Sequence, residues 1–365
     1  MIKVLTIGGA TQDIIIEYQE GSTLFIEKTN PPQLSWQEGS KINVENLHYA
    51  TGGGATNTAV TFEHLGFNTS SFFKIGNDAA GHAVLQDIKN RNITTYHAIT
   101  DKLQTGTSFI IPTPNNDRIV FAYRGANAAL LEKECPDDLI KDQDFIYITS
   151  LTGKAADTLP HLAHTAQKNI ERKGIKVAVN PGTSQLTQNA LPLKAALNSI
   201  DVLIMNTEEM KLFITALKPR HFKSTGSGII TSGPQLARAI LSSGTITFTL
   251  HEYLKEIVSH GVKRVVVTDG KNGVYVATKD TLYFHPALPV PVVNSLGAGD
   301  AFGSCFVAQL VLGKKIEDAL FYGLINAASV IGFHDTKSGI LTQKELEAYK
   351  EGLDSTFLQS FPLNF

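Results

Sequence analysis

The chain has 365 residues, of which 42% are hydrophobic and 18% charged, and its formal net charge is −2. This balance offers no basic surface, so neither nucleic acid nor a membrane is expected as a partner. The sequence contains two cysteines, Cys135 and Cys305, which excludes a disulfide framework and a cysteine-based metal site. There is no run of ~18 apolar residues and no signal-peptide pattern at the start, so the expected location is cytoplasmic.

Short runs rich in valine and isoleucine predict the strands of a buried sheet. These runs are 4–7, 145–149, 176–180, 202–205 and 264–268. Helical patterns lie between several of them, for example at 157–173 and 236–241. Such alternation predicts an α/β fold, with a mainly parallel sheet that carries helices on both faces. Ligands of these sheets bind beyond the carboxyl ends of the strands.

Three β-prone segments break this alternation, because no helical pattern separates them. They are 14–17, 107–112 and 118–123. The sequence Pro-Asn-Asn-Asp at 114–117 is typical of a hairpin turn between the last two. A small separate β structure is therefore expected, although an ordinary edge hairpin would give the same pattern.

A first glycine cluster, Gly-Gly-Gly-Ala-Thr-Asn, occupies residues 52–57. It precedes an apolar run that stops at Gly66, which predicts a turn that opens a helix. Gly53 and Gly54 would allow a ligand to come close to the backbone. Asn57 falls in the first turn and carries both donors and acceptors. On its own, this cluster could also be a simple tight turn.

The most informative stretch is Asn-Ser-Leu-Gly-Ala-Gly-Asp at 294–300, because an apolar, helix-like run follows it. Gly297, Ala298 and Gly299 have little bulk, so their N–H groups can approach an anion at a helix N-terminus. Asp300 would then lie beside a bound phosphate, where it could accept the proton of an attacking alcohol. Taken alone, an aspartate after a glycine at a helix start is more often an N-cap.

Together, the two glycine clusters resemble the N-terminal and C-terminal signatures of the ribokinase family of carbohydrate kinases, also called the PfkB family. Further segments match that family in the same order: 7–13, 76–81, 105–107, 124–127, 206–209 and 268–273. The resemblance implies one ribokinase-like domain over 1–365, with a three-layer α/β fold and a mainly parallel central sheet. It also implies a small β lid, formed from about 10–50 and 105–125. In relatives this lid commonly serves as a dimer surface, so a homodimer through the lid is expected.

The resemblance further implies a kinase that uses ATP and Mg²⁺ to phosphorylate a hydroxyl, on a hydroxymethyl group of a sugar or sugar acid. Asp300 would be the catalytic base, beside an anion hole formed by Gly297, Ala298 and Gly299. The substrate-binding residues would be Asp13, Gly53, Gly54, Asn57 and Arg124. The nucleotide would lie near Asn206, Thr268, Gly270 and Asn326.

Metal binding is predicted at Glu209, which would hold Mg²⁺ through water. Asn206 and Glu209 could equally be a capping pair of a helix. The neutral Asn294 stands where many relatives have an aspartate of a monovalent-cation site, so the sequence leaves the use of K⁺ open. Gly54 stands where ribokinases proper carry lysine, which favours a general family member. The stretch 218–249 is longer than the family pattern and is expected to be a surface insertion, either a mobile flap or a passive loop.

Two alternatives remain open at this stage. A nucleoside kinase, of the adenosine or pseudouridine type, would share this scaffold, and aromatic residues in the pocket would favour it. Phe109, Phe121 and Tyr123 are the candidates, although aromatic residues in strands more often belong to the core. A catalytically silent sugar- or nucleotide-binding protein is the second alternative. Asp300 argues against it, because binding alone needs no base.

Overall fold

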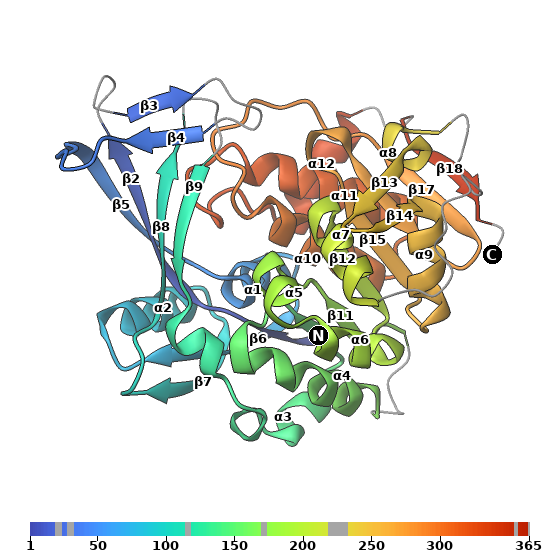
Figure 1. Ribbon diagram of the computed structural model, residues 1–365. Helices are drawn as coiled ribbons and strands as arrows, with labels where there is room; N and C mark the ends of the chain where they lie inside the picture. Colours follow the sequence, from blue (N-terminus) through green and yellow to red (C-terminus); the bar gives the residue numbers. More distant parts are fainter. Residues whose placement is uncertain are drawn as a thin grey trace.

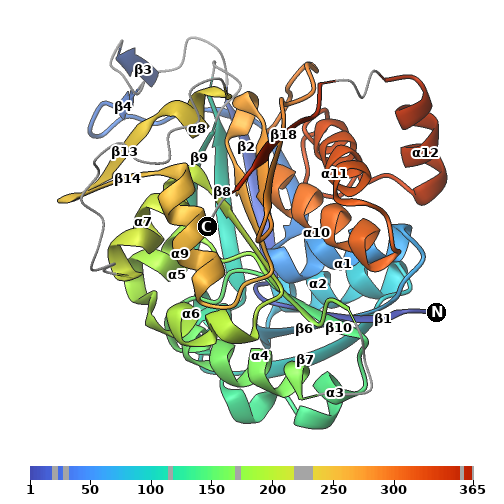
Figure 2. The same ribbon diagram turned by 90° about the vertical axis from the view of Figure 1, so that its right-hand side faces the viewer.

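The computed structural model describes residues 1–18, 24–27, 33–113, 118–168, 174–217, 233–353 and 357–363. Its centre is a ten-stranded sheet in the order β18-β17-β16-β15-β12-β11-β10-β1-β6-β7. Figures 1 and 2 show helices on both faces of this sheet, so the molecule has three layers. The predicted three-layer α/β class is confirmed.

The strands from β7 to β15 in this order are all parallel. They are β1 (Lys3–Ile7), β6 (Asn68–Gly76), β7 (Thr94–Thr100), β10 (Phe145–Ile148), β11 (Val177–Val179), β12 (Val202–Asn206) and β15 (Arg264–Thr268). The antiparallel edge consists of β16 (Val274–Ala277), β17 (Thr281–His285) and β18 (Gln359–Pro362). All five predicted strands are present, each within two residues of its expected ends.

Side chains of one strand alternate between two hydrophobic cores, which explains the continuous apolar runs. In β1, for example, Leu5 and Ile7 belong to one core, whereas Val4 belongs to the other. One core lies under α3 (Asp137–Lys141), α4 (Leu159–Gln167), α5 (Thr183–Asn189), α6 (Leu191–Ala196), α7 (Thr207–Leu217), α8 (Gln235–Arg238) and α9 (Leu250–Ser259). The opposite face carries α1 (Gly54–His64), α2 (Ala79–Asn90), α10 (Ala298–Val311), α11 (Ile316–Val330) and α12 (Gln343–Glu351). Short 3₁₀ turns are η1 (Gly125–Ala129), η2 (Glu132–Glu134), η3 (Gly153–Thr158), η4 (Leu197–Ser199) and η5 (Gly270–Asn272).

A separate four-stranded sheet, in the order β5-β2-β8-β9, stands at the left of Figure 1. It consists of β2 (Thr11–Tyr18), β5 (Val44–Gly52), β8 (Gly106–Pro112) and β9 (Arg118–Tyr123), and we call it the lid sheet. The three β-prone segments of the sequence are thus confirmed as strands. The predicted turn at 114–117 lies outside the described residues. Another pair, β3 (Leu24–Glu27) and β4 (Gln33–Trp36), forms its own two-stranded sheet.

The predicted helix at 236–241 is wrong in its second half. The helix α8 ends at Arg238, and β13 (Ile240–Ser243) then pairs with β14 (Ile246–Thr249) in a hairpin. Gly244 has a φ of 58°, which allows this tight reversal. Of the expected insertion at 218–249, residues 218–232 lie outside the described part. The remainder packs into the core through Leu236 and Phe248, so it is not a passive loop.

The predicted helix at 157–173 is present as the end of η3 and the helix α4, and residues 169–173 lie outside the described part. Within the described ranges, no helix combines the length and the apolar character needed to cross a membrane.

Candidate active site

Half of the predicted site residues meet at one polar cavity of about 370 Å³, beyond the carboxyl ends of β12 and β15. We call it the polar cavity. Its lining includes residues from both glycine clusters and from the two motifs that follow these strands: Gly54, Asn206, Glu209, Thr268, Gly297, Gly299 and Asp300. The rule that ligands bind beyond the carboxyl ends of parallel strands therefore predicted the place of the cavity.

The second glycine cluster opens α10, as predicted. The N-cap is Gly297, whose φ of 81° is left-handed, so Asp300 is a first-turn residue and not the N-cap. A Cβ on residue 297 would lie 2.8 Å from the Cβ of Thr336, whereas a Cβ on residue 299 would meet no atom within 4 Å. The first N–H groups of a helix have no partner in the helix, so this end can receive an anion.

Asp300 is held by a short chain of hydrogen bonds. The Nδ2 atom of Asn57 donates to Oδ2 of Asp300 at 2.9 Å, and Oδ1 of Asn57 accepts from the Thr336 hydroxyl at 2.8 Å. Burial raises the pKa of the Asp300 carboxyl, although the bond from Asn57 lowers it and the charge of Asp13 raises it. A carboxylate of raised pKa is a stronger proton acceptor than an ordinary one.

The residues predicted to bind substrate include Asp13 in β2 of the lid sheet, and Gly53 and Gly54, which follow β5 of that sheet. Asp13 in β2 is buried and accepts a hydrogen bond from Thr11 at 3.0 Å, and its pKa is raised by burial. Gly53 is the N-cap of α1 with a φ of 95°. A Cβ on Gly54 would lie 2.5 Å from the hydroxyl of Thr149, so Thr149 fills the space that a longer side chain would need.

Asn206 and Glu209 form a reciprocal cap at the start of α7. The N–H of Glu209 donates to Oδ1 of Asn206 at 2.8 Å, and the N–H of Asn206 donates to Oε2 of Glu209 at 3.0 Å. The capping alternative is thus confirmed. It does not remove Glu209 from the site, because the same side chain lines the polar cavity. Burial raises the pKa of Glu209, bonds from Asn206 and Thr183 lower it, and the nearby Asp300 charge raises it.

A second cavity of about 590 Å³ adjoins the polar cavity and shares Asn206, Thr268, Ser295 and Gly299 with it. We call it the apolar cavity. Gly270 and Lys271 line one part, and most of the remaining lining is apolar, including Val274, Leu288, Val292, Phe302 and Ile331. The predicted nucleotide residues Thr268 and Gly270 both contribute to it.

Five predicted residues are absent from the linings of these two cavities: Asp13, Gly53, Asn57, Arg124 and Asn326. Asn326 is fully buried, and its side chain is used within the protein: Nδ2 donates to the Ala301 carbonyl and Oδ1 accepts from the Leu341 N–H. The adjacent Ala327 lines the apolar cavity instead. Arg124 lies at the start of η1, and its Nη2 donates to the hydroxyl of Ser184 at 2.8 Å.

Arg118 in β9 lines the polar cavity and was not predicted. Its Nη1 donates to the hydroxyl of Ser295, next to the second glycine cluster. It is the one cation among the described residues that line this cavity. Strand alternation could have found it, because residues 118, 120 and 122 of one strand point to the same side.

Asn294 uses both ends of its amide within its own region. Nδ2 donates to the His334 carbonyl at 2.8 Å, and Oδ1 accepts from the Leu296 N–H at 2.9 Å. The side chain is neutral and already hydrogen-bonded, so it does not fit the role of a carboxylate ligand for a monovalent cation.

Comparison with known proteins gives a family match over most of the chain. The sequence profile described as "pfkB family carbohydrate kinase" matches residues 21–343. A ribokinase of Staphylococcus aureus (strain COL) is 26% identical over 310 residues, which cover 84% of this chain and 87% of the relative. A 5-dehydro-2-deoxygluconokinase of Geobacillus thermodenitrificans is 26% identical over 315 residues, which cover 82% of this chain and 83% of the relative.

Solved structures show the same fold. A nucleoside kinase of Methanocaldococcus jannaschii has a TM-score of 0.72 at 20% identity, over 97% of this chain and 99% of that chain. A candidate ribokinase II of E. coli, solved in complex with ATP and Mg²⁺, has a TM-score of 0.73 at 16% identity, over 97% and 100%. The profile match covers most of the sequence and the fold agrees with it, so this chain is a phosphotransferase that belongs to the pfkB family of carbohydrate kinases.

Proposed function

We propose that this protein transfers the γ-phosphoryl group of ATP to a hydroxyl of a sugar or sugar acid, on a hydroxymethyl group. One observation carries the proposal. Asp300, a carboxylate of raised pKa, lies in the first turn of α10 beside the open end at Gly299, where a polar and an apolar cavity adjoin. An acceptor alcohol in the polar cavity and a nucleotide in the apolar cavity would meet at this point.

Each site residue then has a separate task. Asp300 accepts the proton of the attacking hydroxyl, while the N–H groups of Gly297, Ala298 and Gly299 stabilise negative charge on the transferred phosphoryl group. Asp13 and Asn57 orient the acceptor through its other hydroxyls. Gly53 and Gly54 let that acceptor approach the backbone.

The residues present fit ATP and Mg²⁺. The apolar cavity is lined by Val274, Leu288 and Ile331, which would contact a flat base, and also by Thr268 and Gly270. Glu209 is a buried carboxylate at the edge of the polar cavity, and carboxylates with water are the ligands that Mg²⁺ prefers. When bound, Mg²⁺ would neutralise phosphate charge. Because Asn294 is already hydrogen-bonded, we propose no role for it in holding K⁺.

We assign to Arg118 the substrate-facing role that the sequence predicted for Arg124. Its guanidinium group lines the polar cavity near Ser295, so it would supply positive charge either to the moving phosphoryl group or to the carboxylate of a sugar acid. The cavity also contains the carboxylates of Asp300 and Glu209. Among the described lining residues Arg118 is the one positive charge beside these two carboxylates, so an anion bound in the cavity would depend on it.

The aromatic residues of the lid sheet do not favour a nucleoside. Phe109 pairs with Phe121 across β8 and β9, and Ser108 pairs with Asp13 across β8 and β2. Consecutive residues of a strand point to opposite faces, so Phe109 and Phe121 point away from Asp13. Nucleoside phosphorylation is therefore an outcome for the assay to exclude.

The first test is an ADP-release assay with Mg-ATP against a panel of neutral sugars, sugar acids and nucleosides. We expect turnover with at least one sugar or sugar acid, and phosphorylation at a hydroxymethyl group in the product. Turnover confined to nucleosides would contradict the sugar assignment. Ligand-induced thermal stabilisation without ADP release on any acceptor would instead support the silent binding protein.

We also propose that the lid sheet forms a homodimer through its outer face. Five large apolar side chains are exposed there, by register on the face away from Asp13: Leu47, Tyr49, Phe109, Phe121 and Tyr123. Tyr49 is 65% exposed and Phe121 is 53% exposed. Contiguous apolar surface of this kind usually marks a protein interface.

Replacing Phe121 with aspartate should convert a dimer to a monomer, because an unpaired charge would be buried within the apolar face. Light scattering after size-exclusion chromatography measures the mass. The matched control is Val120→Asp, since Val120 is also exposed but points to the opposite face. A monomeric wild type, or a Phe121→Asp variant that stays dimeric, would contradict the proposal.

A further inference from the structure

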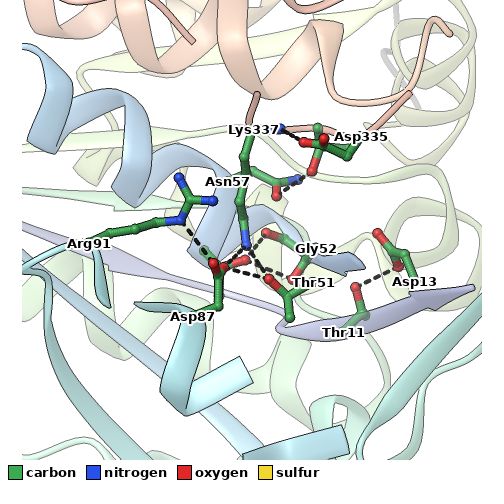
Figure 3. A network of polar contacts seen from close by, with 12 residues as sticks. Thr11, Asp13, Thr51, Gly52, Asn57, Asp87, Arg91, Asp335 and Lys337 are labelled. Atoms are coloured by element: carbon green, nitrogen blue, oxygen red, sulfur yellow. Dashed lines mark hydrogen bonds and ion pairs between the residues drawn. The ribbon is translucent and has the colours of Figure 1, made fainter. Parts of the chain in front are cut away.

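Lys337 is a buried charged side chain that neither cavity explains. Its side chain is 3% exposed, and Nζ donates to Oγ1 of Thr51 at 2.7 Å and to Oδ2 of Asp87 at 2.8 Å (Figure 3). The Thr51 hydroxyl also donates to Asp87, and Nε of Arg91 donates to the other oxygen of Asp87 at 3.0 Å. Burying an ion pair contributes little net stability, so the pair is better explained by the geometry that it fixes.

The ion pair joins three parts of the chain. Lys337 belongs to the turn 335–338 after α11, Asp87 belongs to α2, and Thr51 belongs to β5 of the lid sheet. Asp335 closes the turn, because its Oδ1 accepts the N–H groups of Lys337 and Ser338, each at 2.8 Å. Thr51 directly precedes the glycines 52–54 of the substrate side.

The neighbouring residue in this turn reaches the catalytic base. Thr336 is buried, and its hydroxyl donates to Oδ1 of Asn57, whose Nδ2 donates to Asp300. With its oxygen satisfied by Thr336, the Asn57 amide presents its N–H to Asp300. If the amide rotated, its oxygen would face the carboxylate, which would lose a donor and gain a repulsive contact.

We infer that Lys337 is a positioning residue for catalysis: by fixing the turn 335–338 to Thr51 and Asp87, it holds Thr336 and Asn57 in the arrangement that orients Asp300. The inference rests on the proposed function, since it assigns Asp300 as the base. The same chain of contacts connects the lid sheet to the catalytic base, because it begins at Thr51 in β5 and ends at Asp300.

The charged surroundings predict the sign of a pH effect. The charges of Asp13 on β2 and Glu209 on α7 lie near Asp300, the hydroxyl of Tyr147 on β10 lies close by, and Arg118 on β9 lines the same cavity. Lys337 is faced by Asp87 and Arg91 on α2, by Asp13, and by Asp335 in its own turn. The bond from Asn57 lowers the pKa of Asp300, so losing it should move the acid limb of activity to higher pH.

The experiment compares Lys337→Met, Thr336→Val, the double variant and Lys74→Met in the full-length enzyme. Lys74 is the matched control, because it is also buried and ion-paired, with Glu134 at 2.6 Å, and it lines neither cavity. We expect Lys337→Met and Thr336→Val to lower kcat on the order of ten- to a hundredfold, the size of effect that misplacement of a reacting group produces. KM for ATP should stay near that of wild type, and the acid limb should move to higher pH.

Two features separate positioning from a general loss of structure. The double variant should be no slower than the slower single variant, because both changes break one chain of contacts. Thr336→Val keeps the Lys337 charge, so a shifted acid limb in this variant cannot come from the loss of that charge beside Asp13. If Lys337→Met fails to fold, the kcat and the pH profile of Thr336→Val still test whether the turn 335–338 orients Asp300.

The inference is overturned if Thr336→Val and Lys337→Met retain the kcat and the pH profile of wild type, or if Lys74→Met reproduces their effects at equal folded fraction. The inference is also overturned if the fold-decreases in kcat of the two single variants multiply in the double variant. Failure of the proposed function looks different, since wild type itself would then show no turnover, and this inference would be lost with it.

Discussion

Replacing Asp300 with asparagine is expected to lower kcat by roughly two to four orders of magnitude, the usual contribution of general acid–base catalysis. Asparagine has nearly the same shape and can still accept the hydrogen bond from Asn57, but it cannot take the proton of the attacking hydroxyl. KM for ATP should change little, because the proposed nucleotide site is the adjoining cavity. The ADP-release assay measures both constants.

Stability provides the control for this variant. Because folding raises the pKa of Asp300, the folded protein binds that proton more tightly than the unfolded chain, and the carboxylate costs stability once the pH exceeds its ordinary range. Asp300→Asn should therefore melt at or above the temperature of wild type at neutral pH, and this advantage should vanish at low pH. A variant that retains its kcat, or that loses activity only because it unfolds, would contradict the role of Asp300 as the base.

A second control addresses helix capping. Asp78 is a true N-cap, since its Oδ1 accepts the N–H of Gly81 at 2.8 Å at the start of α2. Asp78→Asn should reduce stability by a modest amount, because Oδ2 of Asp78 also accepts the N–H of Thr105 at 2.8 Å and an amide has a single acceptor oxygen, and it should leave kcat nearly unchanged. If both aspartate variants lost kcat equally, loss of a local helix start would be sufficient to explain the result.

The parts of the site that the sequence predicted are those whose chemistry is local. Gly297 and Gly53 each need a left-handed backbone and a close approach, so glycine is required there and leaves a visible pattern. Asp300 and Asn57 stand within a few residues of these glycines, so the same motifs located them. The strands of the main sheet were equally visible, because burial on both faces demands continuous apolar runs.

The remaining parts depend on contacts that no local pattern carries. Thr336 and Asn57 are 279 residues apart in sequence, so their hydrogen bond could not be read from either segment. Asn326 was assigned to the nucleotide, yet a single step along α11 separates its buried amide from the cavity-lining Ala327. The hairpin at 240–249 replaced a predicted helix because pairing of β13 with β14 overrides a weak helical pattern.

Replacing Arg118 with leucine should lower kcat for every acceptor by at least about a hundredfold, if its guanidinium group stabilises the moving phosphoryl group. An arginine supplied to a phosphoryl group during transfer is worth roughly 10³–10⁵ in kcat, so about a hundredfold is a conservative lower bound for the loss. Arg118→Lys should restore only part of the loss, because an ammonium group lacks the forked donors of a guanidinium.

The kinetic constants distinguish the two tasks that the structure allows for Arg118. Contact with the phosphoryl group affects neutral and acidic acceptors alike and appears mainly in kcat. Contact with the carboxylate of a sugar acid raises KM for acidic acceptors and spares neutral ones. Arg124→Leu is the matched control, because Arg124 follows the same strand yet bonds Ser184 and lines neither cavity, so its kcat should stay close to wild type. Equal losses from the two arginine variants would show that the charge of this region matters, and not the side chain that enters the polar cavity.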